Sequence, residues 1–147
     1  MEPAQVSVAT DMELPHTFER QRQLSRSEPP ASYELRHDRL QRLERAIDGE
    51  SRALNEAMAA DFGHRAEHEC ETYDIIATLS DIRENLRHLA AWMKPRRYPV
   101  RSYMLPGRAR VLPTPLGVVG VVSPWNFPVY LAISPLQRRS PRATAYC

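Results

Sequence analysis

Lysine is almost absent from this sequence, and an excess of either charge is absent too. Lys94 is the only lysine, so arginine carries almost all of the basic charge, and 20 basic residues face 18 acidic ones for a net charge of +2. This mild balance of interspersed signs gives no support for a nucleic-acid partner. The 147 residues contain two cysteines, far apart, and Met1 to Leu24 lacks the apolar core of a signal peptide. We therefore expect a cytoplasmic protein.

A long uninterrupted hydrophobic run is also lacking. The most apolar stretch, residues 118–136, approaches the ~20 residues that a membrane-spanning helix requires. Four residues interrupt it, namely Pro124, Asn126, Pro128 and Pro135. Because these break the helix or expose polar groups, we expect no membrane span.

Apolar residues at helical spacing dominate residues 31–96. Residues 1–30 are polar and are expected to form a mobile N-terminal arm, in which residues 12–24 could form a short helix. Ser32 is a plausible N-cap for a first helix that Gly49 ends, and a second helix begins near Ser51 and stops at residues 61–63. An apolar stripe predicts the clearest helix, which Pro95 ends. The residues of this stripe are Ile75, Leu79, Ile82, Leu86, Leu89 and Met93.

The periodicity changes after this helical part. Residues 97–114 are predicted to form a β-hairpin, with strands at Tyr98–Met104 and Arg108–Leu112 around the turn Pro106-Gly107. From residue 115 to 136 the sequence reads PLGVVGVVSPWNFPVYLAISPL. Val118–Val122 is typical of a strand buried on both faces, and an apolar helix starts at Pro128. The fold class is therefore α/β.

The run PLGVVGVVSPWNFPVYLAISPL resembles the signature segment of the aldehyde dehydrogenase superfamily. Three shorter segments resemble its coniferyl aldehyde dehydrogenase branch. They are ADFGHR at residues 60–65, WMKPRR at residues 92–97 and LPGRARVLPTPLG at residues 105–117. This resemblance implies a hairpin of the oligomerisation type and a homodimer or larger assembly. It also implies that residues 115–136 begin a Rossmann-like cofactor domain, as its first strand, loop and helix. The implied activity is NAD- or NADP-dependent oxidation of a coniferyl-type aromatic or an aliphatic aldehyde to its acid.

The same resemblance assigns roles to four loop residues. Asn126 would donate a hydrogen bond to the oxyanion formed when a cysteine adds to the aldehyde, and Ser123, Pro124 and Trp125 would line the nicotinamide end of the cofactor. From the residues alone, Asn126 could instead close a proline-rich turn, and Trp125 could be a core residue after a strand end.

No residue in the chain matches the other groups that this chemistry needs. In the family, the cofactor-binding lysine, the glycine turn, the glutamate base and the catalytic cysteine follow the segment that ends at Leu136. Cys70 lies among three glutamates, which disfavour a reactive thiolate. His64, His68 and Cys70 could form a zinc site or a solvated helix start. The solvated helix start is favoured because no further ligand pair exists, so we expect no metal.

The tail, residues 137–147, matches nothing in the family. Deletion of one base after the Leu136 codon, in a GC-rich coding sequence, would convert an Ala-rich continuation into this aberrant QRRSPRATAYC sequence. This hypothesis predicts a truncated, inactive N-terminal fragment of low solubility, with residues 118–122 and 129–133 facing water or another chain. The alternative is a non-enzymatic helical interaction module, in which residues 32–94 bind a partner.

Overall fold

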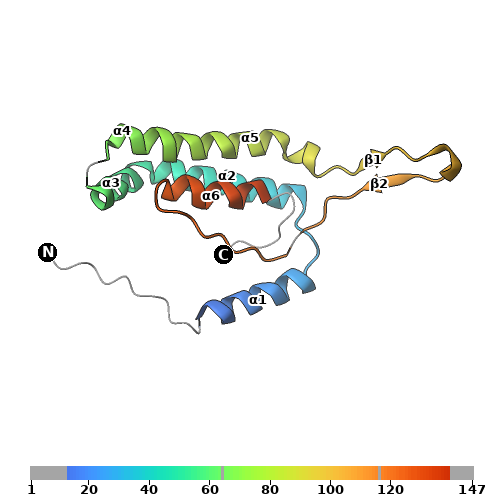
Figure 1. Cartoon of the computed structure of the whole chain (residues 1–147). Coiled ribbons are helices and arrows are strands. Elements are labelled where there is room, and N and C mark those ends of the chain that lie inside the picture. The colour runs from blue at the N-terminus through green and yellow to red at the C-terminus, as the bar shows by residue number, and fades with distance from the viewer. Residues whose placement is uncertain (1–12, 64, 116, 140–147) are drawn as a thin grey trace.

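A computed structural model describes residues 13–63, 65–115 and 117–139 of the chain. In this structure α5 packs against both α2 and α6, and the two-stranded hairpin projects from the helical body (Figure 1). The elements follow in the order α1 (Glu13–Ser27), α2 (Tyr33–Gly49), α3 (Ser51–Phe62), α4 (Glu67–Cys70), η1 (Glu71–Ile76), α5 (Ala77–Trp92), β1 (Arg96–Tyr98), η2 (Ser102–Met104), β2 (Ala109–Val111) and α6 (Pro128–Arg139).

The ends of the first helices follow from local chemistry. The N–H of Leu35 donates to the Ser32 hydroxyl oxygen at 3.2 Å, so Ser32 is the N-cap of α2, as predicted. Helix α3 ends at Gly63, whose φ of 69° lies in the left-handed region that glycine adopts without strain. The helix expected at residues 12–24 is present as α1. Residues 1–12 of the expected arm and residues 140–147 of the tail lie outside the described residues.

The predicted apolar stripe lies on a helix that is longer than the stripe itself. Segments α4, η1 and α5 follow one another without a break from Glu67 to Trp92, and η1 is a π-helical segment of six residues. The expectation of a solvated helix start is wrong for Cys70, whose residue surface is 0% exposed. The thiol behaves as a small apolar group and packs in the core.

The core lies between the long helix, α2, α3 and α6. It is a cluster of six buried side chains, against which Val129 and Ile133 of α6 also pack. The expectation that residues 129–133 would face water is therefore wrong, because α6 docks on the long helix and covers its own apolar side. The six are Ile47, Met58, Cys70, Ile75, Leu79 and Ile82.

The predicted hairpin is present, with shorter strands. β1 pairs antiparallel with β2, with Arg96 opposite Val111 and Tyr98 opposite Ala109. The first strand was predicted to run to Met104, but it ends at Tyr98 because the next residue, Pro99, has no N–H to donate. Residues 102–104 instead form a turn of 3₁₀ helix.

Residues 118–122 form no strand in this structure, contrary to prediction. Val122 is 97% exposed. The described part of the chain contains no further strand that could pair with this segment, and a single strand cannot satisfy its backbone hydrogen bonds. The α/β fold class is confirmed as a helix-rich mixed fold with a small antiparallel sheet, while the strand expected at residues 118–122 is not formed.

Candidate functional site

The four residues predicted to act lie together on the loop before α6. The Ser123 hydroxyl lies 3.2 Å from the Pro128 carbonyl oxygen and 3.1 Å from that of Pro124, and donates across the loop. Trp125 at the tip is 84% exposed, so the alternative of a core tryptophan is wrong in this structure. The loop therefore presents its tip residues outward.

Asn126 is held by its backbone and not by its side chain. Its carbonyl oxygen accepts a hydrogen bond of 2.8 Å from Nη1 of Arg65. Within the described part of the chain, its side-chain amide makes no hydrogen bond, so nothing there supports the alternative in which this amide closes the turn. The amide is exposed and can donate to another group.

Arg65 is a buried cation beneath this loop. Its guanidinium lies between two aromatic rings, 4.9 Å from the centroid of Phe62 and 4.7 Å from that of Phe127. Nη2 lies 3.4 Å from Oδ2 of Asp74, and Nε lies 3.6 Å from Oε1 of Glu69. The side chain is only 6% exposed, so charge attraction and ring contacts, rather than water, stabilise it.

These ion pairs lack hydrogen-bond geometry. Nε and Nη2 of Arg65 and Oδ2 of Asp74 are buried and have no hydrogen-bond partner among the described residues. The pair is therefore electrostatic, and its only directional bond from the guanidinium is the one to Asn126.

Asp74 provides the N-terminal cap of α6 from a different helix. Its Oδ1 accepts from the backbone N–H groups of Val129, at 3.1 Å, and Tyr130, at 3.0 Å. The first backbone bond inside α6 runs from Leu131 to Phe127, whose side chain has no oxygen. The buried carboxylate thus satisfies two amides that have no partner within α6.

A second polar contact joins the same helices further along. The Ser134 hydroxyl donates to Oδ2 of Asp81 at 2.7 Å. Ser134 is buried, whereas the loop tip is exposed. This contact fixes α6 on α5 without touching the loop that carries Asn126.

Neither a nucleophile nor a metal centre is found among the described residues. Cys70 is buried in the core and is inaccessible to a substrate. The described ranges contain no group of three histidine, cysteine, aspartate or glutamate side chains that could hold a metal ion. His64, one of the three residues of the alternative zinc site, lies outside these ranges. In the same ranges, every helix is too short or too polar to cross a bilayer.

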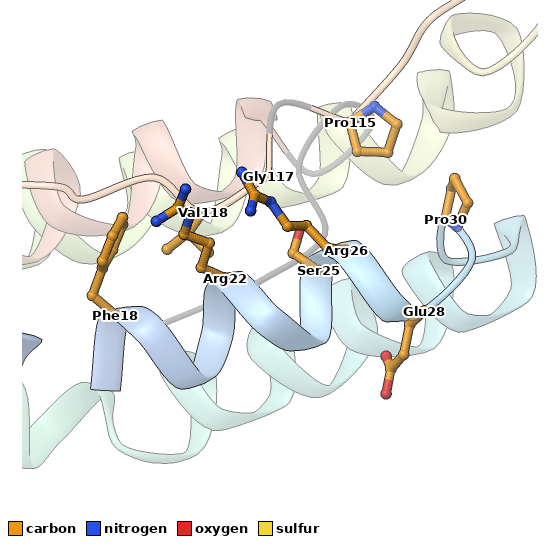
Figure 2. A pocket seen from close by; sticks show the side chains of 9 residues that line it. All are labelled: Phe18, Arg22, Ser25, Arg26, Glu28, Pro30, Pro115, Gly117 and Val118. Atoms are coloured by element: carbon orange, nitrogen blue, oxygen red, sulfur yellow. The ribbon is translucent and has the colours of Figure 1, made fainter. Parts of the chain in front are cut away.

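A surface pocket of about 450 Å³ lies elsewhere, between α1 and the chain that leads into residue 118 (Figure 2). Arg22 and Arg26 extend from α1 toward it, and Arg22 also pairs with Glu19. No residue of the predicted site lines this pocket. Its lining residues are Phe18, Arg22, Ser25, Arg26, Glu28, Pro30, Pro115, Gly117 and Val118.

Comparisons with known proteins identify the family of this chain. Residues 2–137 match the model of the aldehyde dehydrogenase family. The coniferyl aldehyde dehydrogenase of Pseudomonas sp. strain HR199 is 38% identical over 125 residues, which are 84% of this chain and 25% of that protein. Human aldehyde dehydrogenase family 3 member B1 is 32% identical over 103 residues, 70% of this chain and 22% of that protein. The chain belongs to the aldehyde dehydrogenase family.

A solved structure shows the same fold. The substrate-bound state of Staphylococcus aureus AldH superposes with a TM-score of 0.81 at 22% identity, over 87% of this chain and 28% of that one. The chain spans about a quarter of the length of the relatives it matches.

Proposed function

We propose that residues 115–136 supply the oxyanion-binding loop for NAD(P)-dependent oxidation of an aldehyde to a carboxylic acid. Asn126 is the donor: the single observation that carries the proposal is that this exposed residue is fixed by Arg65 through its backbone while its side-chain amide makes no hydrogen bond among the described residues. Addition of a cysteine thiolate to the aldehyde carbon places negative charge on the carbonyl oxygen. A neutral, directional amide stabilises that charge without reacting.

The preceding residues are proposed to bind the cofactor. NAD or NADP supplies the hydride acceptor for this chemistry when bound. Ser123, Pro124 and Trp125 would line its nicotinamide end, and the outward position of Trp125 leaves a flat apolar face for such a contact. The substrate class proposed, coniferyl-type aromatic or aliphatic aldehydes, is supported by the coniferyl aldehyde dehydrogenase names of similar proteins.

We further propose that the 147-residue chain does not catalyse this reaction alone. The reaction needs an accessible thiolate and a general base, and Cys70 is buried.

The tail from residue 137 is proposed to arise from a frameshift, although α6 continues three residues beyond Leu136. Sequencing the gene and its downstream flank tests this: an Ala-rich helix and catalytic cysteine in another frame would support it, and their absence in every frame would refute it.

A cytoplasmic location and a homodimer or larger assembly are proposed on family grounds. In that assembly the hairpin β1–β2 would pair subunits, and its exposed residues, including Tyr98 at 65% exposure, are available for such a contact. Size measurement of the intact enzyme, with and without Tyr98→Glu, tests the assembly.

A chimaera tests the catalytic proposal. Residues 13–136 would replace the matching segment in the Pseudomonas sp. HR199 enzyme, and cofactor binding would confirm that the product is folded. We expect aldehyde oxidation, and a fall in kcat of about 100-fold or more for Asn126→Ala, as for other oxyanion donors. Thr114→Ala, an exposed change outside the loop, is the control. Unchanged kcat for Asn126→Ala in a cofactor-binding chimaera would refute the role of Asn126.

A further inference from the structure

We propose that Arg65 and Asp74 are positioning residues that clamp the Asn126 loop from both sides. Arg65 holds the carbonyl of Asn126, and Asp74 holds the amides of Val129 and Tyr130. The catalytic meaning of this clamp rests on the proposed function, because it concerns the same loop. The clamp itself is a property of this chain and can be tested without any turnover.

The Asp74 half of the clamp replaces a cap that the loop sequence lacks. A helix leaves its first amides without intrahelical acceptors, and serine, threonine, aspartate or asparagine at the N-cap usually accepts one. Phe127, which accepts the first bond of α6, cannot do this. Because Asp74 lies on η1, its two hydrogen bonds fix the start of α6 relative to the long helix.

The Arg65 half of the clamp fixes the loop upstream of α6. The guanidinium has limited freedom, since it lies over the rings of Phe62 and Phe127 and its Nη2 lies 3.4 Å from Oδ2 of Asp74. A rigid planar donor of this kind directs its N–H toward one place, and that place is the Asn126 carbonyl. Lysine has neither the plane nor the fork, so it cannot make these contacts together.

The location of Asp74 provides independent support. Asp74 lies in a π-helical segment, a rare geometry that occurs often at functional sites. A carboxylate that is 0% exposed is costly to bury unless its bonds are specific. Here its bonds go to the first turn of α6, more than fifty residues away in sequence, so burial of the carboxylate is coupled to the position at which the loop joins α6.

Amide hydrogen exchange by NMR on the 147-residue chain tests the clamp. For Asp74→Ala we expect Val129 and Tyr130 to exchange about tenfold faster relative to Leu89 in the core of α5, the change expected for a lost hydrogen bond. For Arg65→Met we expect the side-chain amide resonances of Asn126 to move. Asp74→Asn, which keeps an acceptor, should leave the two amides largely protected, so a folded variant remains if Asp74→Ala unfolds.

Ser134→Ala is the matched control, because it removes a hydrogen bond between the same two helices away from the loop. It should leave Val129, Tyr130 and the Asn126 resonances at wild-type values. The clamp is refuted if Asp74→Ala speeds exchange at Val129 and Tyr130 only in proportion to Leu89, or, should that variant unfold, if a folded Asp74→Asn loses protection at these two amides although it keeps an acceptor. It is also refuted if the Asn126 resonances stay in place in Arg65→Met.

The catalytic consequence is tested separately in the chimaera. Arg65→Met should lower kcat with little change in KM, Arg65→Lys should not rescue it, and Ser134→Ala should be neutral. If Asn126→Ala is without effect there, the proposed function fails, whereas the exchange data still decide the clamp. If Asn126→Ala lowers kcat but Arg65→Met does not, the positioning role fails and the proposed function stands.

Discussion

Arg65 and Asp74 bring opposite charges within 3.4 Å where their side chains are 6% and 0% exposed. Desolvation of two such ions is expensive, so the pair contributes little net stability when intact. Loss of Arg65, however, leaves Asp74 as a buried charge without its ion-pair partner, and loss of Asp74 leaves Arg65 with only the half-exposed Glu69. The stability of the described fold therefore depends on both residues being present.

Asp74→Ala is predicted to destabilise the chain by about 3 kcal/mol or more, the usual cost of breaking a buried ion pair. It removes the buried charge partner of Arg65 and the one oxygen that accepts from both Val129 and Tyr130. Urea unfolding followed by circular dichroism measures the change. A loss under about 1 kcal/mol would mean that water reaches Arg65 and replaces the carboxylate.

A surface ion pair between α2 and α5 should behave differently. Arg83 Nε lies 2.7 Å from Oε1 of Glu44, but the Arg83 side chain is 57% exposed. Arg83→Met is expected to cost under about 1 kcal/mol, and the effect should shrink in high salt because solvent ions screen the pair. Unfolding at low and high ionic strength tests this. A loss as large as that of Asp74→Ala would contradict it.

Core truncation is predicted to be costly in the long helix. Leu89 is 0% exposed, and Leu89→Ala should destabilise the chain by about 3 kcal/mol through lost apolar burial and a cavity. Leu14→Ala, at a residue that is 72% exposed in α1, is the control and should change stability by under about 0.5 kcal/mol. Equal effects of the two changes would show that the helical body is not packed as described.

The first turn of α2 should show a pH-dependent contribution. The Glu34 carboxyl is exposed, and its pKa lies below the ordinary value of 4.5. The main cause is a hydrogen bond with the backbone of Glu34 itself, and the second is a hydrogen bond with the Ser32 side chain. This stabilisation is present above that ordinary value and is lost as the pH falls through the lower pKa of the folded state. Glu34→Gln should therefore flatten the acid side of the stability profile. A steeper loss of stability at acid pH in Glu34→Gln than in the wild-type chain would contradict this prediction.

Removal of the cap itself is a separate test. Ser32→Ala should destabilise α2 by about 1 kcal/mol, because the Leu35 amide loses its acceptor. Ser32→Asp should restore most of the loss. Thermal melting of the three proteins at neutral pH gives the comparison, and equal melting temperatures for all three would show that the cap contributes nothing.

Helical periodicity predicted most of this fold. The stripe ending at Met93 and the cap at Ser32 are local signals, since each depends on residues within a few turns. The strand at residues 118–122 was predicted from its composition, but a strand forms only beside a partner, and the described chain provides none. The same limit applies to Cys70, because its acidic neighbours in sequence point elsewhere and its own side chain points into the core.

The loop residues of the candidate site were identified from their motif, whereas the clamp beneath them was missed. Arg65 and Asp74 contact residues 61 and 55 positions away, and no local pattern reports contacts of that range. One signal was available: Asp74 and Thr78 are polar residues four apart on the buried side of the longest stripe, and both are 0% exposed. Polar groups at such positions need partners. Thr78 donates to the backbone carbonyl oxygen of Asp74 within the long helix, whereas the hydrogen-bond donors to the Asp74 carboxylate arrive with α6.

The hairpin has a consequence for how quickly the α6 cap can form. Asp74 and Val129 are joined only after the chain between them closes into a loop, and the entropy lost in closure grows with loop length. Pairing of Arg96 with Val111 is local and takes the residues between them out of that loop. A hairpin that forms early therefore shortens the loop that must close before α6 packs against the long helix. Weakening the hairpin should slow folding more than it lowers stability.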